Sequence, residues 1–187
     1  MNKVLQGRTA IVTGGGMGIG QGIARALAGA GADVLIAQRS LDAAEAEAAH
    51  LRQAFGVRAV ARKVDVTVRE EVEAMVAAAV ETLGRLDILV NNAGGSFPKR
   101  LENHTDEDMQ GSFLLNYWSA FWAMRAAFPA MKAQGYGRII NLGSLNGVNA
   151  HMFTVAYNAS KEALRTLTRT AAVEWGEHGI TANVICP

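Results

Sequence analysis

The 187 residues of this chain are enough for one domain with a substantial core; half are hydrophobic and 19% are charged, as in globular proteins whose sheet is buried on both faces. A net charge of +1 gives no sign of nucleic acid or of an anionic membrane as a partner, and we expect neither. The only cysteine, Cys186, excludes a disulfide within the chain, and the first seven residues lack the apolar run of a signal peptide, so we expect a cytoplasmic protein.

Strand and helix patterns alternate along the whole chain, with short apolar runs predicting strands and longer amphipathic runs predicting helices. In chain order, we expect strand 9–13, helix 18–30, strand 33–38, helix 41–55, strand 59–64, helix 70–83, strand 87–91, a long helix near 112–133, strand 137–142, helix 156–177 and strand 181–186. Thr67 and Glu70, at the spacing of a capping box, would start the third of these helices. The alternation predicts one Rossmann-type α/β domain over residues 1–187, a doubly wound parallel sheet flanked by helices on both faces.

A glycine-rich turn joins the first expected strand to the first helix. Its spacing, Gly14-x-x-x-Gly18-x-Gly20, departs from G-x-G-x-x-G, but the glycines can still supply a tight turn, close backbone approach and close helix–strand packing. Backbone N–H groups and the positive end of the helix dipole would face a pyrophosphate. We therefore predict that Gly14, Gly18, Ile19 and Gly20 bind a dinucleotide, while S-adenosylmethionine in an α/β methyltransferase is an alternative ligand for such a turn.

Two residues near the end of the chain, Tyr157 and Lys161, are four apart and share one helix face, one turn from each other. A cation beside a phenol stabilises the phenolate, so this tyrosine could exchange a proton near neutral pH. Ser144 stands thirteen residues before Tyr157, at the end of an apolar strand. Taken singly, these residues could be a core tyrosine, a lysine that reaches to solvent and a helix cap.

Together these motifs resemble those of the short-chain dehydrogenase/reductase family, over the whole chain and in the expected order. The resemblance is carried by Thr13-Gly14-x-x-x-Gly18-Ile19-Gly20, Asp65-Val66-Thr67, Asn91-Asn92-Ala93-Gly94, Asn116, Ser144 and Tyr157-x-x-x-Lys161. It implies an oxidoreductase that interconverts a ketone and a secondary alcohol by hydride transfer with a nicotinamide dinucleotide. A non-catalytic dinucleotide-binding protein of the same fold is the alternative, although the catalytic residues are intact.

The resemblance also implies a role for each catalytic residue. Tyr157 would be the general acid and base, and Ser144 would hydrogen-bond the substrate oxygen. Lys161 would assist Tyr157 and hold the hydroxyl groups of the nicotinamide ribose. Asn116 would anchor a water molecule that links Lys161 to solvent.

Further positions would contact the cofactor. By the resemblance, Asp65, with Val66 beside it, would accept a hydrogen bond from the adenine amino group, and the stretch Asn92, Ala93 and Gly94 would lie against the adenosine ribose and the nicotinamide side. After the second strand, NAD-binding folds place an acidic residue, whereas this chain has neutral Gln38, then Arg39 and Ser40. A guanidinium suits a 2′-phosphate, so we expect NADP(H) to be favoured over NAD(H).

The substrate, a small carbonyl compound or alcohol, should meet walls from residues 95–100 and 148–155. His151 would face it, and Met152 and Phe153 would add apolar surface; Lys99 and Arg100 would either meet an acidic group or lie in a solvated loop. The histidines have no metal-ligand spacing, so we expect no metal.

Members of the family continue past the proline at Pro187 into a substrate-covering segment and a last strand, so we expect this C-terminal lid portion and strand to be absent here. By family likeness, the helices near 112–133 and 156–177 could form a four-helix contact in a homo-oligomer, either a dimer or a tetramer.

Overall fold

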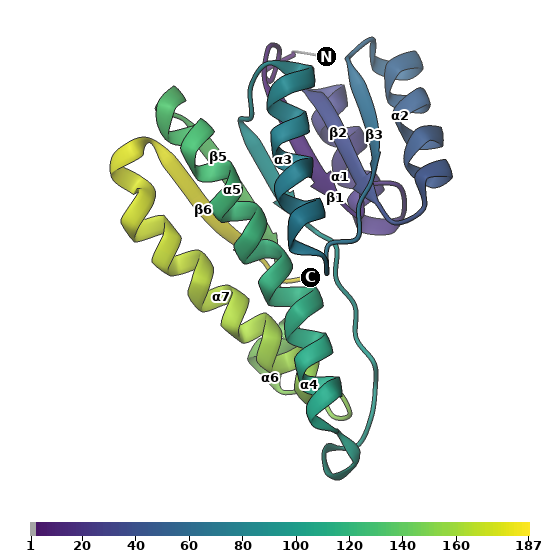
Figure 1. The fold of residues 1–187 in the computed structure, drawn as a ribbon, viewed down its shortest axis with the longest axis vertical. Coiled ribbons are helices and arrows are strands. Elements are labelled where there is room, and N and C mark those ends of the chain that lie inside the picture. The colour runs from purple at the N-terminus through teal and green to yellow at the C-terminus, as the bar shows by residue number, and fades with distance from the viewer. Residues whose placement is uncertain (1–2) are drawn as a thin grey trace.

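The computed structural model describes residues 3–187, which form one six-stranded parallel sheet in the order β3-β2-β1-β4-β5-β6. The strands are β1 (Thr9–Thr13), β2 (Asp33–Gln38), β3 (Ala59–Lys63), β4 (Ile88–Asn91), β5 (Gly137–Leu142) and β6 (Ile180–Ile185). The chain first builds outward from β1 through β2 to β3, then returns to the other side of β1 and builds outward from β4 to β6 (Figure 1). The direction of winding therefore reverses between β1 and β4, where such sheets bind their ligands.

Helices cover both faces of this sheet (Figure 1). The helices α1 (Gly18–Gly29) and α2 (Leu41–Phe55) pack on one face, and α3 (Arg69–Leu83), α5 (Ser119–Gln134) and α7 (Val155–Trp175) pack on the other. Shorter elements complete the chain: α4 (Asp106–Phe113), a π-helical turn (Leu114–Trp118), α6 (Leu145–Asn149) and two 3₁₀ turns (Leu101–Asn103 and Gly176–His178). Within residues 3–187, no helix is both long enough and apolar enough to span a bilayer.

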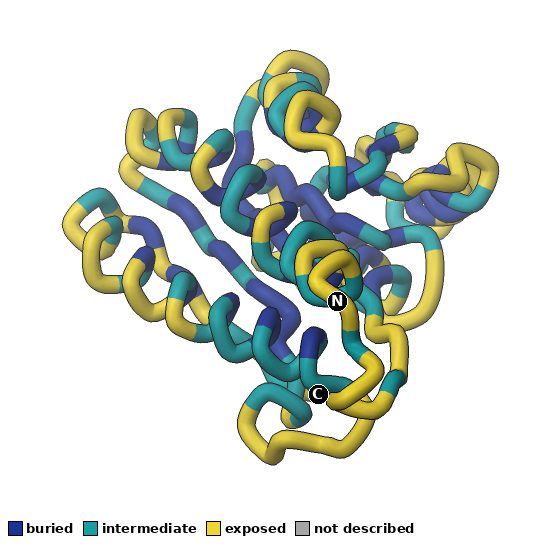
Figure 2. The backbone as a smooth tube through the Cα atoms, turned by 60° about the horizontal axis from the view of Figure 1, so that its bottom comes forward, coloured by how far each residue is buried: buried dark blue, intermediate teal, exposed yellow. Residues whose placement is uncertain are grey.

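Two apolar cores hold the layers together because successive side chains of a strand point to opposite faces. Ile11, Leu35 and Leu89 face α3 and α5, whereas Val12 and Ile36 face α1 and α2. The inner strands are accordingly buried, the edge strands β3 and β6 are only partly buried, and the outer helix surfaces are exposed (Figure 2). The buried sheet is the rigid support from which the loops at its carboxyl edge extend.

The predicted fold class and element order are confirmed, with most ends within one or two residues. Two details were wrong. Thr67 caps no helix: its hydroxyl donates to Asp65 Oδ1 at 2.6 Å, and α3 begins after Val68 without a side-chain cap. The long helix expected from residue 112 starts earlier, at Asp106, because Thr105 and Asp108 form a capping box there, and it passes through the π-helical turn into α5.

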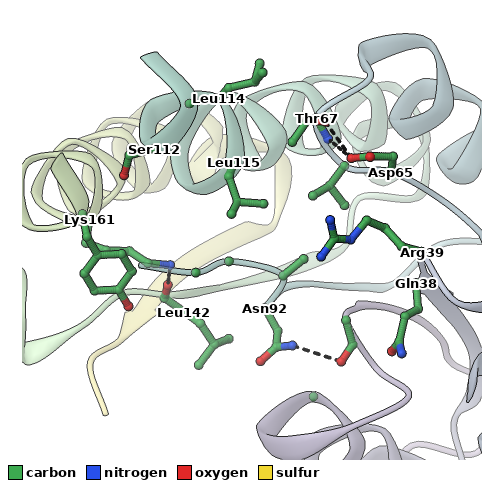
Figure 3. Close-up of a pocket in the computed structure, with 18 of the residues that line it drawn as sticks. Gln38, Arg39, Asp65, Thr67, Asn92, Ser112, Leu114, Leu115, Leu142 and Lys161 are labelled. Carbon is green, nitrogen blue, oxygen red and sulfur yellow. Dashed lines mark hydrogen bonds between the residues drawn. The ribbon is translucent and has the colours of Figure 1, made fainter. Parts of the chain in front are cut away.

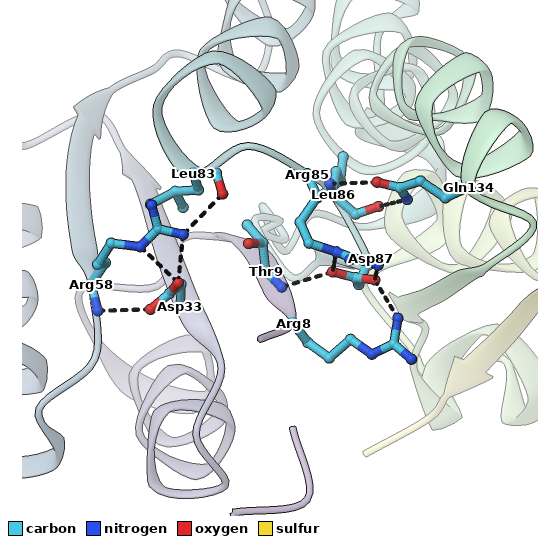
Figure 4. A network of polar contacts seen from close by, with 9 residues as sticks. All are labelled: Arg8, Thr9, Asp33, Arg58, Leu83, Arg85, Leu86, Asp87 and Gln134. Atoms are coloured by element: carbon cyan, nitrogen blue, oxygen red, sulfur yellow. Dashed lines mark hydrogen bonds and ion pairs between the residues drawn. The ribbon is translucent and has the colours of Figure 1, made fainter. Parts of the chain in front are cut away.

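A buried carboxylate ties the opposite, amino-terminal edge of the sheet together (Figure 4). Asp87 is fully buried and accepts hydrogen bonds from Arg8 Nη1 at 2.8 Å, from Arg85 Nε at 2.7 Å and from the Thr9 N–H at 2.9 Å. Burial opposes ionisation of Asp87, but the bonds from Arg85, Thr9 and Arg8 outweigh it and hold the pKa of this carboxyl below its ordinary value. Asp87 thus joins β1 to β4 as an ion.

We expect Asp87→Asn to lower the free energy of unfolding by about 2 kcal/mol at neutral pH, because both arginines lose their buried partner but stay partly solvated. A folded pKa below the unfolded value means that this contribution is complete above about pH 4 and disappears as the pH falls through the folded pKa. Urea unfolding of both proteins at pH 7 and near pH 3 measures it. A stability difference that is equal at the two pH values would contradict the ionic role.

Candidate active site

A cleft of about 950 Å³ opens along the carboxyl edge of the sheet, beside the point where the winding reverses (Figure 3). The turn after β1, the ends of β2, β4 and β5, the helical segment around Leu115 and the first turns of α7 surround it. Sequence-predicted residues that line it are Gly14, Ile19, Gly20, Arg39, Ser40, Asp65, Val66, Asn92, Ala93, Gly94, Ser144, Tyr157 and Lys161. The structure therefore brings the two halves of the expected site together.

The glycine turn is compact in the way that the sequence suggested. Gly14 and Gly18 have positive φ angles of 65° and 54°, a region that favours glycine. A Cβ on Gly20 would come within 2.2 Å of the Gly14 carbonyl oxygen, so only glycine allows this approach of α1 to the turn. The start of α1 consequently lies against the cleft.

Three side chains, those of Gln38, Thr13 and Asn92, hold the turn in place, a task that the sequence analysis assigned to none of them. Gln38 Oε1 accepts from the Gly16 N–H at 2.7 Å. The Thr13 hydroxyl accepts from the N–H groups of Asn92 and Ala93, both at 3.0 Å, and Asn92 Nδ2 donates to the Thr13 carbonyl at 2.8 Å. These long-range contacts join the ends of β1, β2 and β4, and only the three-dimensional fold reveals them.

Arg39 and Asp65 form the far end of the cleft, where the Arg39 guanidinium extends into the open space (Figure 3). The hydroxyl and N–H of Thr67 donate to Asp65 Oδ1, and together with the positive charge of Arg39 they lower the pKa of Asp65. Ser40 caps α2 by accepting from the Ala43 N–H at 3.4 Å. This end of the cleft thus presents one cation, one ionised carboxylate and a helix N-terminus.

Tyr157 and Lys161 stand at the other end of the cleft, on the first two turns of α7. Lys161 is 4% exposed, and its Nζ donates to the Leu142 carbonyl at 2.6 Å and lies 5.6 Å from the centroid of the Tyr157 ring. Burial lowers the pKa of Lys161 to about 8. Nζ has two further hydrogens that this carbonyl does not use, so the ammonium can bind additional acceptors.

Ser144 follows β5 and caps α6, which is the helix-cap role that the sequence analysis gave as the alternative, but it also lines the cleft. Its Oγ accepts from the Asn146 N–H at 3.2 Å, and no described residue accepts the hydroxyl hydrogen. The cap thus orients Oγ and leaves its donor for a group inside the cleft. The two interpretations of this serine are compatible.

Asn116 lies behind the cleft wall, in the π-helical turn, and is almost fully buried. Its Oδ1 accepts from the Gly95 N–H at 3.1 Å, and its Nδ2 donates to the Gly95 carbonyl at 3.0 Å. A Cβ on the neighbouring Gly94 would come within 2.7 Å of Asn116 Oδ1 and 3.2 Å of Lys161 Nζ. Asn116, Gly94 and Lys161 therefore pack in direct succession beneath the cleft.

Three residues expected to face substrate are placed elsewhere. His151, Met152 and Phe153 line a separate hollow of about 380 Å³ between α6, α7 and the loop that follows β4, and the main cleft does not include them. The backbone turns away because Ala150 and Phe153 adopt positive φ angles, and the Phe153 carbonyl accepts from the Lys99 N–H at 2.7 Å. The apolar surface toward the cleft includes Phe97, which lies in the predicted wall of residues 95–100, and Leu114, Leu115 and Leu142, which the sequence analysis did not single out.

The basic residues of the loop after β4 also have partners. Lys99 pairs with Asp108, and Asp108 also accepts a hydrogen bond from the Thr105 N–H. These two interactions lower the pKa of Asp108 to about 2. Arg100 lies with its guanidinium carbon 5.5 Å from the Phe153 ring centroid. Lys99 thus anchors its own loop to α4, so an acidic substrate group would have to compete with Asp108 for it.

Comparison with known proteins supplies independent information. A sequence model of the family described as short chain dehydrogenase matches residues 8–187. The D-beta-hydroxybutyrate dehydrogenase of Cupriavidus necator is 40% identical over 185 residues, which cover 98% of this chain and 71% of that protein.

Solved structures agree with this match. A 7 alpha-hydroxysteroid dehydrogenase complexed with NADH and 7-oxo glycochenodeoxycholic acid superposes with a TM-score of 0.95 at 36% identity, over 100% of this chain and 72% of that one. An NAD⁺-bound xylitol dehydrogenase gives a TM-score of 0.94 at 33% identity, over 98% of this chain and 70% of that one. The chain therefore spans about 70% of the length of each of these relatives.

Proposed function

This chain belongs to the short-chain dehydrogenase family, and we propose that its cleft interconverts a ketone and a secondary alcohol with Tyr157 as the general acid and base. It is an oxidoreductase whose relatives act on hydroxyl and keto groups and use a nicotinamide dinucleotide. The observation that carries the proposal is the placement of Tyr157, Lys161 and Ser144 at one end of a cleft whose other end begins at a glycine turn and helix N-terminus.

The cleft fits a dinucleotide because the backbone approaches it closely at the glycine turn and one helix points its N-terminus at it. Residues 14–20 would hold the pyrophosphate, Asp65 and Val66 the adenine, and residues 92–94 the ribose and nicotinamide side. When bound, the nicotinamide supplies or accepts the hydride.

At the nicotinamide end, Tyr157, Ser144 and Lys161 each have a hydrogen-bonding or proton-transfer group available for this chemistry. In reduction, the carbonyl carbon gains a hydride and its oxygen becomes an alkoxide, which the Tyr157 hydroxyl protonates; in oxidation the phenolate accepts the proton. The free Ser144 hydrogen would donate to the same oxygen, and the N–H of Asn146 on Oγ polarises that hydroxyl. The Lys161 ammonium would stabilise the phenolate and bind the ribose hydroxyls with its two remaining hydrogens.

A carbonyl and alcohol panel tests the proposed reaction directly. We expect turnover of at least one of D-beta-hydroxybutyrate, xylitol and a 7alpha-hydroxysteroid, or their keto forms, followed by the absorbance of reduced nicotinamide. Relatives with these substrates guide the panel, which also includes cyclic ketones. Binding of the dinucleotide with no turnover of any ketone or secondary alcohol would favour a non-catalytic role.

We also propose that the cofactor is NADP(H) in preference to NAD(H). Gln38 Oε1 accepts from the Gly16 N–H, and no described residue uses the hydrogens of Gln38 Nε2, which can therefore be offered to the cofactor. Arg39 adds a guanidinium in the open cleft, and the Ser40 hydroxyl is beside it at the N-terminus of α2. Donors without a carboxylate acceptor suit a 2′-phosphate rather than a pair of ribose hydroxyls.

The cofactor preference predicts a measurable reversal. We expect wild type to favour NADP(H) in kcat/KM by roughly tenfold or more, the size of one or two hydrogen bonds to a charged group, and Gln38→Asp/Arg39→Leu to favour NAD(H). The single change Gln38→Glu retains an acceptor for Gly16 but adds a negative charge, so it separates charge from loss of the turn's support. A wild-type preference for NAD(H) would contradict the proposal.

Assembly into a homo-oligomer and a cytoplasmic location stay predictions from the sequence.

A further inference from the structure

Two buried serine hydroxyls connect the helices that carry the catalytic groups. Ser112 lies in α4 and Ser160 lies in α7, and each is at most 5% exposed. Their Oγ atoms are 3.3 Å apart, which makes this a hydrogen bond between two segments 48 residues apart in sequence. Figure 3 shows Ser112 beside the turns of α7 that carry Lys161.

The hydrogen bonds around this pair all run in one direction. Ser160 Oγ is 2.8 Å from the Tyr157 carbonyl, which can only accept, so the Ser160 hydrogen is committed there. Ser112 must then donate to Ser160 Oγ. Ser112 Oγ in turn accepts from Asn116 Nδ2 at 3.3 Å, which closes a chain from Asn116 through both hydroxyls to the backbone of Tyr157.

Both ends of this chain bear on the reacting groups. At one end, Asn116 bonds to both the N–H and the carbonyl of Gly95. Its Oδ1 and the Nζ of Lys161 both lie close to Gly94. At the other end, the Tyr157 carbonyl belongs to the helical turn that sets Tyr157 against Lys161. This series of hydrogen bonds therefore links the position of α7 along its axis to the position of the loop after β4.

We propose that Ser112 and Ser160 are positioning residues, which hold the turn from Tyr157 to Lys161 in register with Asn116 and the backbone at Gly94. The inference rests on the proposed reaction. Ser112 is among the residues that line the cleft and Ser160 is not, but the hydroxyl of Ser112 is bonded to Ser160, so each serine acts through Asn116 or Tyr157. A sub-ångström shift of α7 would misalign the proton donor with the substrate oxygen while leaving the distant pyrophosphate and adenine contacts intact.

Replacement by alanine should leave a folded protein. In Ser112→Ala, Asn116 Nδ2 retains its bonds to the carbonyls of Ser112 and Gly95, and Ser160 retains the Tyr157 carbonyl. No buried hydrogen is left without an acceptor in this variant, whereas Ser160→Ala removes the oxygen that accepts the Ser112 hydroxyl hydrogen. Ser119 is a matched control, because it is another buried serine along the same helical segment, and within residues 3–187 its hydroxyl bonds only to the Leu115 carbonyl, at 2.6 Å.

The test measures kcat and both KM values in Ser112→Ala, Ser160→Ala, the double variant and Ser119→Ala, with the best ketone of the panel. We expect roughly tenfold lower kcat in each of the first two, a cofactor KM within about twofold of wild type, and a double variant no slower than the slower single one. The primary isotope effect with deuterated cofactor should rise toward its intrinsic value. Ser119→Ala should stay within about twofold of wild type.

Three results would overturn the proposal: wild-type kcat in both single variants, an equal loss in Ser119→Ala, or losses that multiply in the double variant. If wild type turns over no ketone or alcohol, the proposed reaction fails separately. Hydrogen exchange at the amides of residues 157–161 then decides about the serines. Exchange of these amides should be faster in Ser112→Ala and unchanged in Ser119→Ala. Unchanged exchange in both variants would contradict the proposal that the serines hold residues 157–161 in position.

Discussion

Tyr157→Phe should lose at least about a hundredfold in kcat, as is typical when a general acid is removed, while the affinity for the cofactor stays close to that of wild type. The change removes one oxygen atom from a side chain that lines the cleft, and no hydrogen bond of the Tyr157 hydroxyl to another described residue is lost with it. Steady-state kinetics with the best ketone of the panel measures kcat. Fluorescence titration of reduced nicotinamide measures binding on the same preparations.

Tyr117→Phe is the matched control for the phenol. Tyr117 is a half-buried tyrosine of the π-helical turn whose ring packs against Phe113, Trp118 and Phe121, and it does not line the cleft. Its loss of a hydroxyl should leave kcat nearly unchanged. Near-normal turnover in Tyr157→Phe would mean that another group transfers the proton, and the proposed mechanism would be wrong.

The sequence sufficed for the fold because its signals are local and repeat along the chain. Most strands are short apolar runs, and an amphipathic helical pattern follows most of them along the chain. The glycine turn marks the first βα unit. The wrong details came from competition between local signals. The Thr67 hydroxyl, which a capping box at α3 would need, bonds to Asp65 instead. At α4, Asp108 takes the capping-box position that glutamate or glutamine usually occupies.

The site was only partly predictable, for a physical reason. Motif residues at strand ends converge on the cleft because parallel strands deliver their carboxyl ends to one edge, which the alternation of elements already implies. Loop conformation is not encoded in that way. His151 lies outside the cleft because Ala150 and Phe153 have positive φ angles and the Phe153 carbonyl accepts from the Lys99 N–H. Gln38 supports Gly16, 22 residues earlier, only because β1 and β2 pair in the folded sheet.

Gly94 shows how a residue without a side chain can matter as much as a catalytic group. It separates Asn116 Oδ1 from Lys161 Nζ, and any Cβ there would stand 2.7 Å from the first atom and 3.2 Å from the second. Asn116 cannot retreat easily, because it is almost fully buried and bonded to Gly95 on both sides of its amide. The strain of an added methyl group would therefore move the backbone at Gly94 or the ammonium.

We expect Gly94→Ala to lower kcat about a hundredfold, the scale of a displacement of about 1 Å at reacting groups, and to weaken cofactor binding as well, because Lys161 and the backbone at residue 94 both face the nicotinamide end. Gly22→Ala is the control, since a Cβ on that helical glycine of α1 meets nothing within 4 Å and alanine favours the helix. Kinetics and nicotinamide titration of both variants, with thermal unfolding as a check on folding, separate a local displacement from general destabilisation. If Gly94→Ala unfolds normally and retains wild-type kcat, then Lys161 and Asn116 can shift without cost, and the close packing beneath the cleft is not what aligns the reaction.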